Sequence, residues 1–408
     1  MTGHADVAGM SRHERRVERR RTPRIDTGGR PLHDRLASLE VVVCCGSGGV
    51  GKTTVSAALG MAMAMSVDKR VLVLTVDPAK RLATALGLRG LGSDPVVIPR
   101  ARLRSAGSTP RGELSAAMLD MKSTWDRMVE RYAPDRQAAE RILRNRFYQR
   151  ISDAFVGSHE YAAMEALYEL HNSGEYDCVI VDTPPSRNAL DFLEAPDRVS
   201  EYVGARLLSW LAAPSRYGFR AVNLAAGPFL RLADRLLGSD VLREVSEFVR
   251  DLEKLYGGVQ RRARAVYRLL RSPAVGFVVV TTLEPGPFAE AEFFCAKLRE
   301  YSMPLRALLV NRVLPETLRD ASGQAAAAAL AENGTVASWM ADELGRRVPP
   351  ETLRALGEVH LTLAALARRD ARQLSRLERL SDVAVTRIPL FTDEISELEG
   401  LVRVAALL

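Results

Sequence analysis

Residues that build disulfide frameworks and metal clusters are scarce in this sequence. It has four cysteines and six histidines among 408 residues, with no C-x-x-C pair and no histidine cluster. This pattern does not suggest a disulfide framework or a metal cluster. Three of the cysteines lie in apolar, strand-like runs, so we expect buried free thiols in a reducing compartment. The cysteines are Cys44, Cys45, Cys178 and Cys295.

Long hydrophobic runs are also absent. No segment approaches the roughly 18–20 consecutive apolar residues that a membrane-spanning helix needs. The polar, arginine-rich start lacks the apolar region of a signal peptide. Hydrophobic residues make up 47% and charged residues 26% of the chain, which is typical of a globular protein. We therefore expect a cytoplasmic protein and leave open a peripheral position at the inner membrane.

Much of the excess positive charge lies in one segment near the start of the chain. The net charge is +7, and residues 11–30 hold eight arginines against three acids. One interpretation is a basic arm that contacts nucleic acid or lipid. The other, which we favour, is a solvated disordered tail. We accordingly expect no nucleic-acid partner.

Glycine, by contrast, is concentrated at one point. Residues 46–53 read Gly-Ser-Gly-Gly-Val-Gly-Lys-Thr and fit G-x-x-x-x-G-K-[ST], the P-loop. An apolar strand is predicted before this stretch at 40–45, and a helix after it at 52–66. A loop between a buried strand and a helix start directs backbone N–H groups at one point, where the helix dipole favours anions.

This setting predicts that the loop binds the phosphates of ATP together with Mg²⁺. The glycines permit a close backbone approach. Lys52 would contact the β- and γ-phosphates, and the Thr53 hydroxyl would bind the metal ion. The predicted nucleotide-binding residues of the loop are Gly46, Ser47, Gly48, Gly49, Val50, Gly51, Lys52, Thr53 and Thr54.

Two carboxylates at predicted strand ends complete the candidate site. Asp182 follows the apolar run 178–181, at the position where P-loop NTPases hold Mg²⁺ through water. Asp77 follows the apolar run 70–76, and could bind the metal's water shell or orient the attacking water. The candidate catalytic residues are Lys52, Asp77 and Asp182, and the candidate metal ligands are Thr53, Asp77 and Asp182.

Strand and helix patterns alternate along the rest of the chain. This alternation implies parallel βαβ crossovers. We expect an α/β fold with a doubly wound, mostly parallel sheet of P-loop NTPase type and a helical insertion subdomain. Beyond the segments already named, strands are predicted at 275–282, 305–311 and 383–389, helices at 78–90, 287–301, 315–380 and 393–407, and a loop at 93–112.

The predicted domain organisation has two parts. Residues 1–35 form a disordered basic arm, and residues 36–408 form one P-loop ATPase domain. Helical insertions in this domain are expected at about 112–172 and 195–272, since neither stretch shows a strand pattern.

The order of these motifs resembles that of the ArsA-type ATPases. This family of deviant P-loop proteins includes the arsenite-pump ATPase and the tail-anchored-protein targeting ATPase. Its motif G-K-G-G-V-G-K-T-T matches residues 46–54 except at the second position. Its motifs D-P-A-H-x-L-S-D and D-T-A-P-T-G-H-T-L partly match residues 77–84 and 182–190. The chain is most similar to actinobacterial anion-transporting-ATPase-like subunits, which resemble members of heteromeric pairs.

The resemblance implies further contacts and a partner. Asn311 matches the family's adenine-contacting segment, and Pro389 and Phe391 match its late adenine loop. It also implies that ATP binding and hydrolysis close and open a dimer. For this chain we expect a heterodimer with a paralogous ATPase subunit, which handles a client protein or a membrane-linked process.

Three positions depart from the family pattern. Ser47 replaces a lysine that crosses the dimer interface to the partner's nucleotide. Thr84 replaces the aspartate that polarises the attacking water, and Asn188 replaces a switch histidine. A partner subunit could supply the missing lysine. The alternative is a catalytically weak regulatory or scaffold subunit with ATP as a structural ligand, and a weaker one is a partition-type ATPase that works through the basic arm.

Residues 202–233 contain no acidic residue and mix arginines with large apolar side chains. Their position resembles that of the insertion in which the targeting ATPase holds a client's transmembrane helix. The segment could contact a hydrophobic client or a membrane surface. The alternative, which we favour, is a helical subdomain that packs on itself or on a partner subunit.

Overall fold

The computed structural model describes residues 30–76, 81–88, 90–145, 148–149, 159–183, 251, 258, 261–332, 334–343, 349–380, 383–393, 395 and 397–408. The chain divides into two compact units. We call residues 31–281, 285–309 and 394–408 the P-loop unit, and residues 1–30, 282–284 and 310–393 the helical unit.

An eight-stranded sheet with the strand order β3-β4-β2-β5-β1-β6-β7-β8 forms the framework. The pairs β2–β4, β2–β5, β1–β5 and β1–β6 are parallel, and only β3–β4 is antiparallel among the pairs whose register is defined. The sequence prediction of a mostly parallel α/β sheet is therefore confirmed. The strands are β1 (Val41–Cys45), β2 (Arg70–Thr75), β3 (Val96–Val97), β4 (Glu113–Met118), β5 (Cys178–Asp182), β6 (Val275–Thr281), β7 (Leu305–Val313) and β8 (Val385–Pro389).

The central strands form because nearly every residue in them is apolar. All residues of β1, β5 and β6 are buried, as expected for strands covered on both faces. In the parallel register, Asp182 at the end of β5 lies beside Cys44 of β1 and Thr75 of β2. The carboxyl ends of three adjacent strands therefore meet where the P-loop begins.

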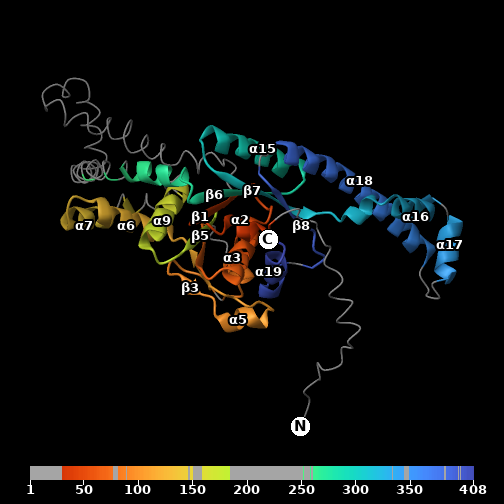
Figure 1. Ribbon diagram of the computed structural model, residues 1–408, viewed down its shortest axis with the longest axis horizontal. Coiled ribbons are helices and arrows are strands. Elements are labelled where there is room, and N and C mark those ends of the chain that lie inside the picture. Colours follow the sequence, from red (N-terminus) through yellow and green to blue (C-terminus); the bar gives the residue numbers. More distant parts are fainter. Residues whose placement is uncertain are drawn as a thin grey trace, which may run out of the picture. The chain divides into compact units, whose positions relative to one another are not determined.

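Helix α3 follows the P-loop and packs against β1, β2 and β5 as well as α2 and α19 (Figure 1). Its residues are buried from Val55 to Ala64 because the sheet and these helices surround it. The helices of the P-loop unit are α2 (Leu32–Leu36), α3 (Lys52–Ser66), α4 (Arg81–Ala85), α5 (Arg100–Ser105), α6 (Met121–Tyr132), α7 (Arg136–Arg144), α9 (His159–Ser173), α15 (Pro285–Glu300) and α19 (Leu398–Ala405).

The helical unit is built on one long helix. Helices α16 and α17 both pack along α18, and α16 and α17 contact each other. The sequence prediction of helix over 315–380 agrees with these elements. They are the 3-10 helix η1 (Glu316–Arg319) and the α-helices α16 (Ala321–Glu332), α17 (Gly334–Glu343) and α18 (Pro350–Leu380).

The prediction was wrong in two neighbouring segments. Residues 113–118, expected to begin a helical insertion, form β4, which pairs in parallel with β2. Residues 93–112, expected to be a loop, include β3 and α5. The run Glu113–Met118 contains a serine and two alanines, which carry little strand propensity, so pairing with β2 decides its structure.

The part of the chain that the structure describes begins at residue 30, inside the segment assigned to the basic arm. Leu32 and Leu36 of α2 are each 1% exposed, and the His33 backbone N–H donates to the Leu408 carbonyl at 2.8 Å. Residues 1–29 and the basic segment 202–233 lie outside the described residues.

All four cysteines are free and buried, which confirms the expectation of unpaired core thiols. Burial raises the pKa of Cys44 and of Cys178 to about 12, and that of Cys295 to about 11. Within the described ranges, no helix is long and apolar enough to cross a membrane.

Candidate functional site

The P-loop joins β1 to α3 through glycines in conformations that other residues avoid. Gly46, Gly49 and Gly51 have φ values of 147°, 79° and 92°. A Cβ on Gly46 would lie 2.0 Å from the carbonyl oxygen of Val280 in β6. The first glycine of the motif is therefore required both by its own backbone and by the neighbouring strand.

Lys52 is the first residue of α3, and its side chain folds back over the loop. The ammonium donates to the carbonyl oxygens of Gly46 at 2.9 Å and Ser47 at 2.8 Å. The residue is only 6% exposed, so its charge lies inside the loop rather than in bulk water. A buried, hydrogen-bonded cation next to a helix N-terminus favours an anionic ligand.

Asp182 links the P-loop to the sheet. It is fully buried, and its Oδ2 accepts hydrogen bonds from the Thr53 hydroxyl at 2.7 Å and the Thr75 hydroxyl at 2.9 Å. The structure thus brings Thr53 and Asp182, two of the three predicted metal ligands, into direct contact. The sequence analysis did not identify Thr75, because its place beside Asp182 depends on the register between β2 and β5.

The residues that follow β2 and β5 form hydrogen bonds at the carboxyl ends of the central strands. The Thr183 hydroxyl donates to the Cys44 carbonyl at 2.9 Å, and the Val76 N–H donates to the Asp182 carbonyl at 3.2 Å. Val76 is the last described residue before Asp77, which lies outside the described residues together with Asn188. The predicted roles of Asp77 therefore remain predictions.

These residues fit a magnesium–nucleotide complex. The loop offers three glycines with positive φ, a buried ammonium and the start of a 15-residue helix. Mg²⁺ prefers one or two carboxylates together with phosphate and water oxygens. Thr53 and Asp182 supply a hydroxyl and a buried carboxylate at one point. The chemistry of the donor set therefore suits a phosphate-bound metal ion better than a metal held by protein ligands alone.

The predicted adenine-contacting residues lie in the helical unit. Asn311 is in β7, Pro389 ends β8, and Phe391 follows it. The Leu390 N–H donates to the Val313 carbonyl at 2.9 Å, so the carboxyl ends of these strands meet. Asn311 accepts the Arg312 N–H on its side-chain oxygen at 2.9 Å.

Arg312 carries an unusual backbone beside this candidate adenine contact. Its φ is 60°, a conformation that costs a non-glycine residue about 1–2 kcal/mol. Such strain is often found at functional sites. Among the described residues of the helical unit, Arg312 near the end of β7 is therefore where the backbone itself marks a candidate site.

Thr84, which the motif resemblance aligns with a water-polarising aspartate, is on α4. It lines a cavity of about 520 Å³ together with residues of α5 and the start of α19, among them Arg102 and Glu399. A hydroxyl at this position cannot act as a general base in the way that a carboxylate does.

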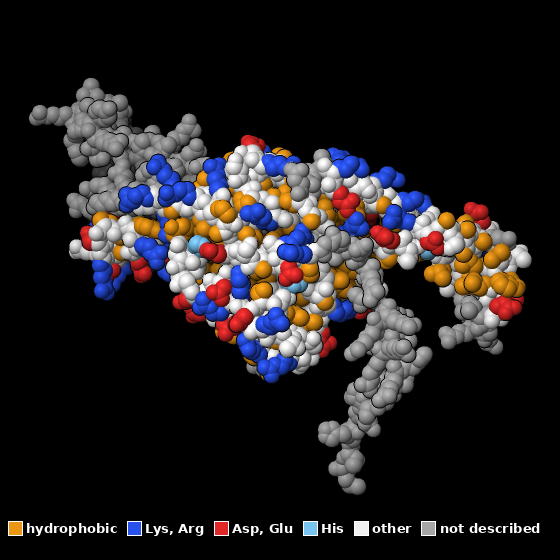
Figure 2. Space-filling view, viewed as in Figure 1, with side chains coloured by type: hydrophobic (Ala, Val, Ile, Leu, Met, Phe, Trp, Pro, Cys, Tyr) orange, Lys and Arg blue, Asp and Glu red, His pale blue; other side chains and the backbone are white. Residues whose placement is uncertain are grey.

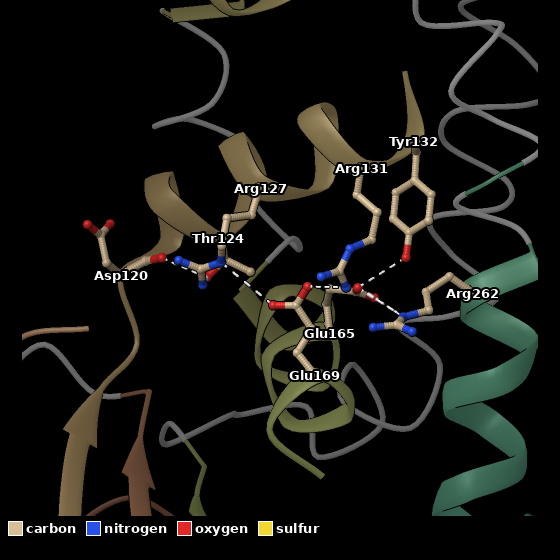
Figure 3. Close-up of polar contacts among 8 residues, drawn as sticks. All are labelled: Asp120, Thr124, Arg127, Arg131, Tyr132, Glu165, Glu169 and Arg262. Atoms are coloured by element: carbon tan, nitrogen blue, oxygen red, sulfur yellow. Dashed lines mark hydrogen bonds and ion pairs between the residues drawn. The ribbon is translucent and has the colours of Figure 1, made fainter. Parts of the chain in front are cut away.

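A buried ion pair between α9 and residue 262 was not predicted from the sequence. Glu165 of α9 is fully buried and accepts two hydrogen bonds from the Arg262 guanidinium, at 2.9 and 3.0 Å. The Tyr132 hydroxyl, on α6, reaches the same carboxylate at 3.3 Å. Figure 3 shows Tyr132 and Arg262 pointing at Glu165 from different helices. Burial raises the pKa of Glu165, and the guanidinium opposes that shift.

A second carboxylate of α9 extends this network. Glu169 pairs with Arg131 at 2.5 Å and Arg127 at 3.6 Å, both on α6 (Figure 3). Helix α9 leads into β5, which ends at Asp182. The network therefore holds α6 and residues 261–270 against α9, the helix that leads into β5 and its buried carboxylate, Asp182.

Asp182→Asn keeps the size of this side chain and removes its charge. We expect the hydroxyls of Thr53 and Thr75 to keep an oxygen acceptor, so the fold survives. We expect the ATP hydrolysis rate to fall by roughly 10²–10³, since a buried group that holds the metal's charge is lost. The ratio of ATP affinities measured with Mg²⁺ and with EDTA should fall as well.

A matched control for that substitution lies just before the start of the same strand. Asp177 is exposed and pairs with Arg70 at 2.9 Å. Asp177→Asn should leave hydrolysis and the Mg²⁺ dependence of binding unchanged, because exposed pairs contribute little. Equal losses in both variants would contradict a metal role for Asp182.

Comparisons with known proteins agree with this geometry. The sequence model of a protein family described as anion-transporting ATPase matches residues 39–333. The chain is 27% identical over 283 residues to the ATPase get3 of Schizosaccharomyces japonicus, spanning 69% of this chain and 77% of that protein. It is 23% identical over 288 residues to the putative arsenical pump-driving ATPase 1 of Aquifex aeolicus, spanning 68% of this chain and 64% of that protein. These findings confirm the resemblance identified from the motifs.

Proposed function

The chain belongs to the family of anion-transporting ATPases, and from this premise we propose that it is one subunit of a nucleotide-gated dimer. As a member of this family it is an ATP-binding ATPase. In the proposed cycle, ATP binding closes the subunits on each other and hydrolysis opens them. The observation that supports the nucleotide site of this proposal is the buried contact of Asp182 with the P-loop hydroxyl of Thr53, and the dimer is what membership of the family suggests.

Each site residue has a separate proposed role. Lys52 and the backbone N–H groups of residues 48–53 hold the phosphates, because they present positive charge at a helix start. Thr53, Asp182 and Asp77 hold Mg²⁺ directly or through its water. When bound, the ion neutralises charge that develops on the phosphate oxygens. Asn311 and residues 389–391 contact adenine.

We propose a paralogous ATPase subunit as the partner. Ser47 carries no charge, so two copies of this chain would lack a crossing lysine at both nucleotide sites. A paralogue with that lysine would complete the site on this chain. For residues 202–233 we keep the interpretation favoured from the sequence, a helical subdomain that packs on itself or on a partner subunit, with contact to a hydrophobic client or a membrane surface as the alternative.

Two departures favour a second candidate function. Ser47 and Thr84 stand where the family places a cation and a water-polarising carboxylate. A subunit without both groups would bind ATP as a structural ligand and hydrolyse it slowly. Single-turnover hydrolysis, first with the chain alone and then with its co-purified partner, separates the two functions. Acceleration by the partner supports the heteromeric ATPase, and an unchanged slow rate supports the scaffold.

Ser47→Lys tests the missing charge within this chain. We expect the hydrolysis rate of the isolated variant to rise more than about tenfold, because a crossing cation is worth up to roughly 10³–10⁵ in rate. Ser47→Gln is the matched control, since it has similar length without charge. Equal rates for the two variants would contradict the proposal that the crossing charge limits turnover.

A further inference from the structure

Asp182 is held in a different way from a carboxylate on the protein surface. Acidic side chains lie at several places on the surface, where water can solvate them (Figure 2). Asp182 is 0% exposed, so groups of the protein must provide the hydrogen bonds that water gives to a surface carboxylate. The arrangement of those groups therefore decides where the charge of Asp182 lies relative to the P-loop.

Two hydroxyl groups from different elements donate to the same oxygen of Asp182. The Thr53 hydroxyl of α3 donates to Oδ2 at 2.7 Å, and the Thr75 hydroxyl of β2 donates to it at 2.9 Å. Thr75 is 2% exposed, so bulk water does not compete for its hydrogen bond. Hydrogen bonds to an ionised acceptor are stronger than those between neutral groups. The position of Oδ2 is thus fixed from the loop side and from the sheet side.

The two donors differ in their relation to the nucleotide. Thr53 belongs to the loop and is a proposed ligand of Mg²⁺, so its surroundings change when a nucleotide binds. Thr75 belongs to the sheet, where the parallel register of β2 and β5 places it directly beside Asp182. The next residue adds a backbone contact, since the Val76 N–H donates to the Asp182 carbonyl at 3.2 Å. The end of β2 therefore holds both the carboxylate and the backbone of Asp182.

The composition of β2 indicates that the Thr75 hydroxyl is present for this contact. Residues 71–74 are apolar and buried, and Thr75 is the only polar residue in the buried part of the strand. Valine has the same branched shape and suits a buried strand at least as well. A hydroxyl at this position costs free energy unless it has a partner, and Asp182 is a partner on the neighbouring strand.

We propose that Thr75 is a positioning residue for the Mg²⁺-dependent hydrolysis of ATP. The proposal rests on the proposed function, in which Asp182 holds the metal ion directly or through its water. The Thr75 hydroxyl keeps the Asp182 carboxylate in one place while the surroundings of Thr53 change. Mg²⁺ and its water then meet an acceptor that is already oriented. Thr75 acts through Asp182 and does not itself contact the metal ion.

Thr75→Val tests this role, because it removes the hydroxyl and keeps the shape of the side chain. Calorimetric titration with ATP at a series of Mg²⁺ concentrations gives the Mg²⁺ concentration that produces half of the gain in ATP affinity. We expect that concentration to rise about ten- to hundredfold, as is usual when a hydrogen-bond partner of a metal ligand is lost. The affinity for ATP in EDTA should be unchanged. The kcat at saturating Mg²⁺ should fall about tenfold, with little change in the KM for ATP.

Two further variants separate positioning from packing. Thr75→Ser keeps a hydroxyl and should restore the Mg²⁺ dependence of the wild type. Thr281→Val is the matched control: Thr281 is 0% exposed, ends β6, and donates to the Pro287 carbonyl at 3.0 Å. It should leave the Mg²⁺ dependence unchanged. Circular dichroism checks that each variant is folded, and Thr75→Ala takes the place of Thr75→Val if the valine variant does not fold.

The possible outcomes are distinct. A wild-type Mg²⁺ dependence in Thr75→Val, or a tighter response to Mg²⁺, would overturn the role of Thr75. A loss that Thr75→Ser does not restore, or that Thr281→Val reproduces, would also overturn it. Failure of the proposed function would instead appear in the wild type, as ATP binding that ignores Mg²⁺, and would overturn both proposals.

Discussion

Lys52→Ala is expected to abolish measurable ATP hydrolysis and to weaken ATP binding severely. Lys52 is 6% exposed, and its ammonium lies within 2.9 Å of two loop carbonyl oxygens at the start of α3. No other described side chain puts a cation inside the loop. Removing one preorganised donor from such a site costs roughly 10²–10³ in rate, and the loss is larger when the donor carries charge.

Hydrolysis should be measured as phosphate release at saturating ATP, and binding by calorimetry. Lys122→Ala is the matched control: Lys122 pairs with Asp126 at 2.8 Å on the exposed face of α6. We expect that control to behave as the wild type. A Lys52→Ala protein with wild-type affinity for ATP would show that the nucleotide binds somewhere other than this loop.

Gly46→Ala is expected to produce the largest loss of stability among single-methyl additions to the P-loop. The new Cβ would lie 2.0 Å from a backbone oxygen of β6, which cannot move without disturbing its strand. The φ of 147° adds conformational strain. Together these effects should lower the free energy of unfolding by about 3 kcal/mol or more.

Urea denaturation followed by circular dichroism measures that loss. Gly49→Ala is the matched control, since its φ of 79° is also unfavourable but a Cβ there meets nothing within 4 Å. It should cost only about 1–2 kcal/mol. An equal loss of unfolding free energy in the two variants would mean that β6 is not as close to Gly46 as the structure places it.

Local patterns explain why the core of the site could be predicted from sequence. The P-loop, the strand before it and the helix after it are contiguous, so composition and spacing were sufficient. Asp182 was also predictable, because it ends a wholly apolar strand. Its hydroxyl partner Thr75 depends on the register between β2 and β5, which the sequence alone does not specify.

Long-range packing explains what the sequence did not reveal. Glu165 and Arg262 are separated by 97 residues, and only the folded chain brings them together. The strand β4 is rich in small residues and forms because β2 provides a pairing edge. The contacts of α18 with α16 and α17 were visible only as a long helical pattern, since sequence cannot tell which face a neighbouring helix covers.

The central claim is that this loop holds a magnesium-bound nucleotide. Calorimetric titration of the purified wild-type chain with ATP, in the presence and absence of Mg²⁺, tests it most directly. We predict saturable binding of one nucleotide per chain, tighter with Mg²⁺ than with EDTA. Heat changes that do not saturate, or an affinity that ignores the metal ion, would contradict the assignment of Lys52, Thr53 and Asp182 to a nucleotide site.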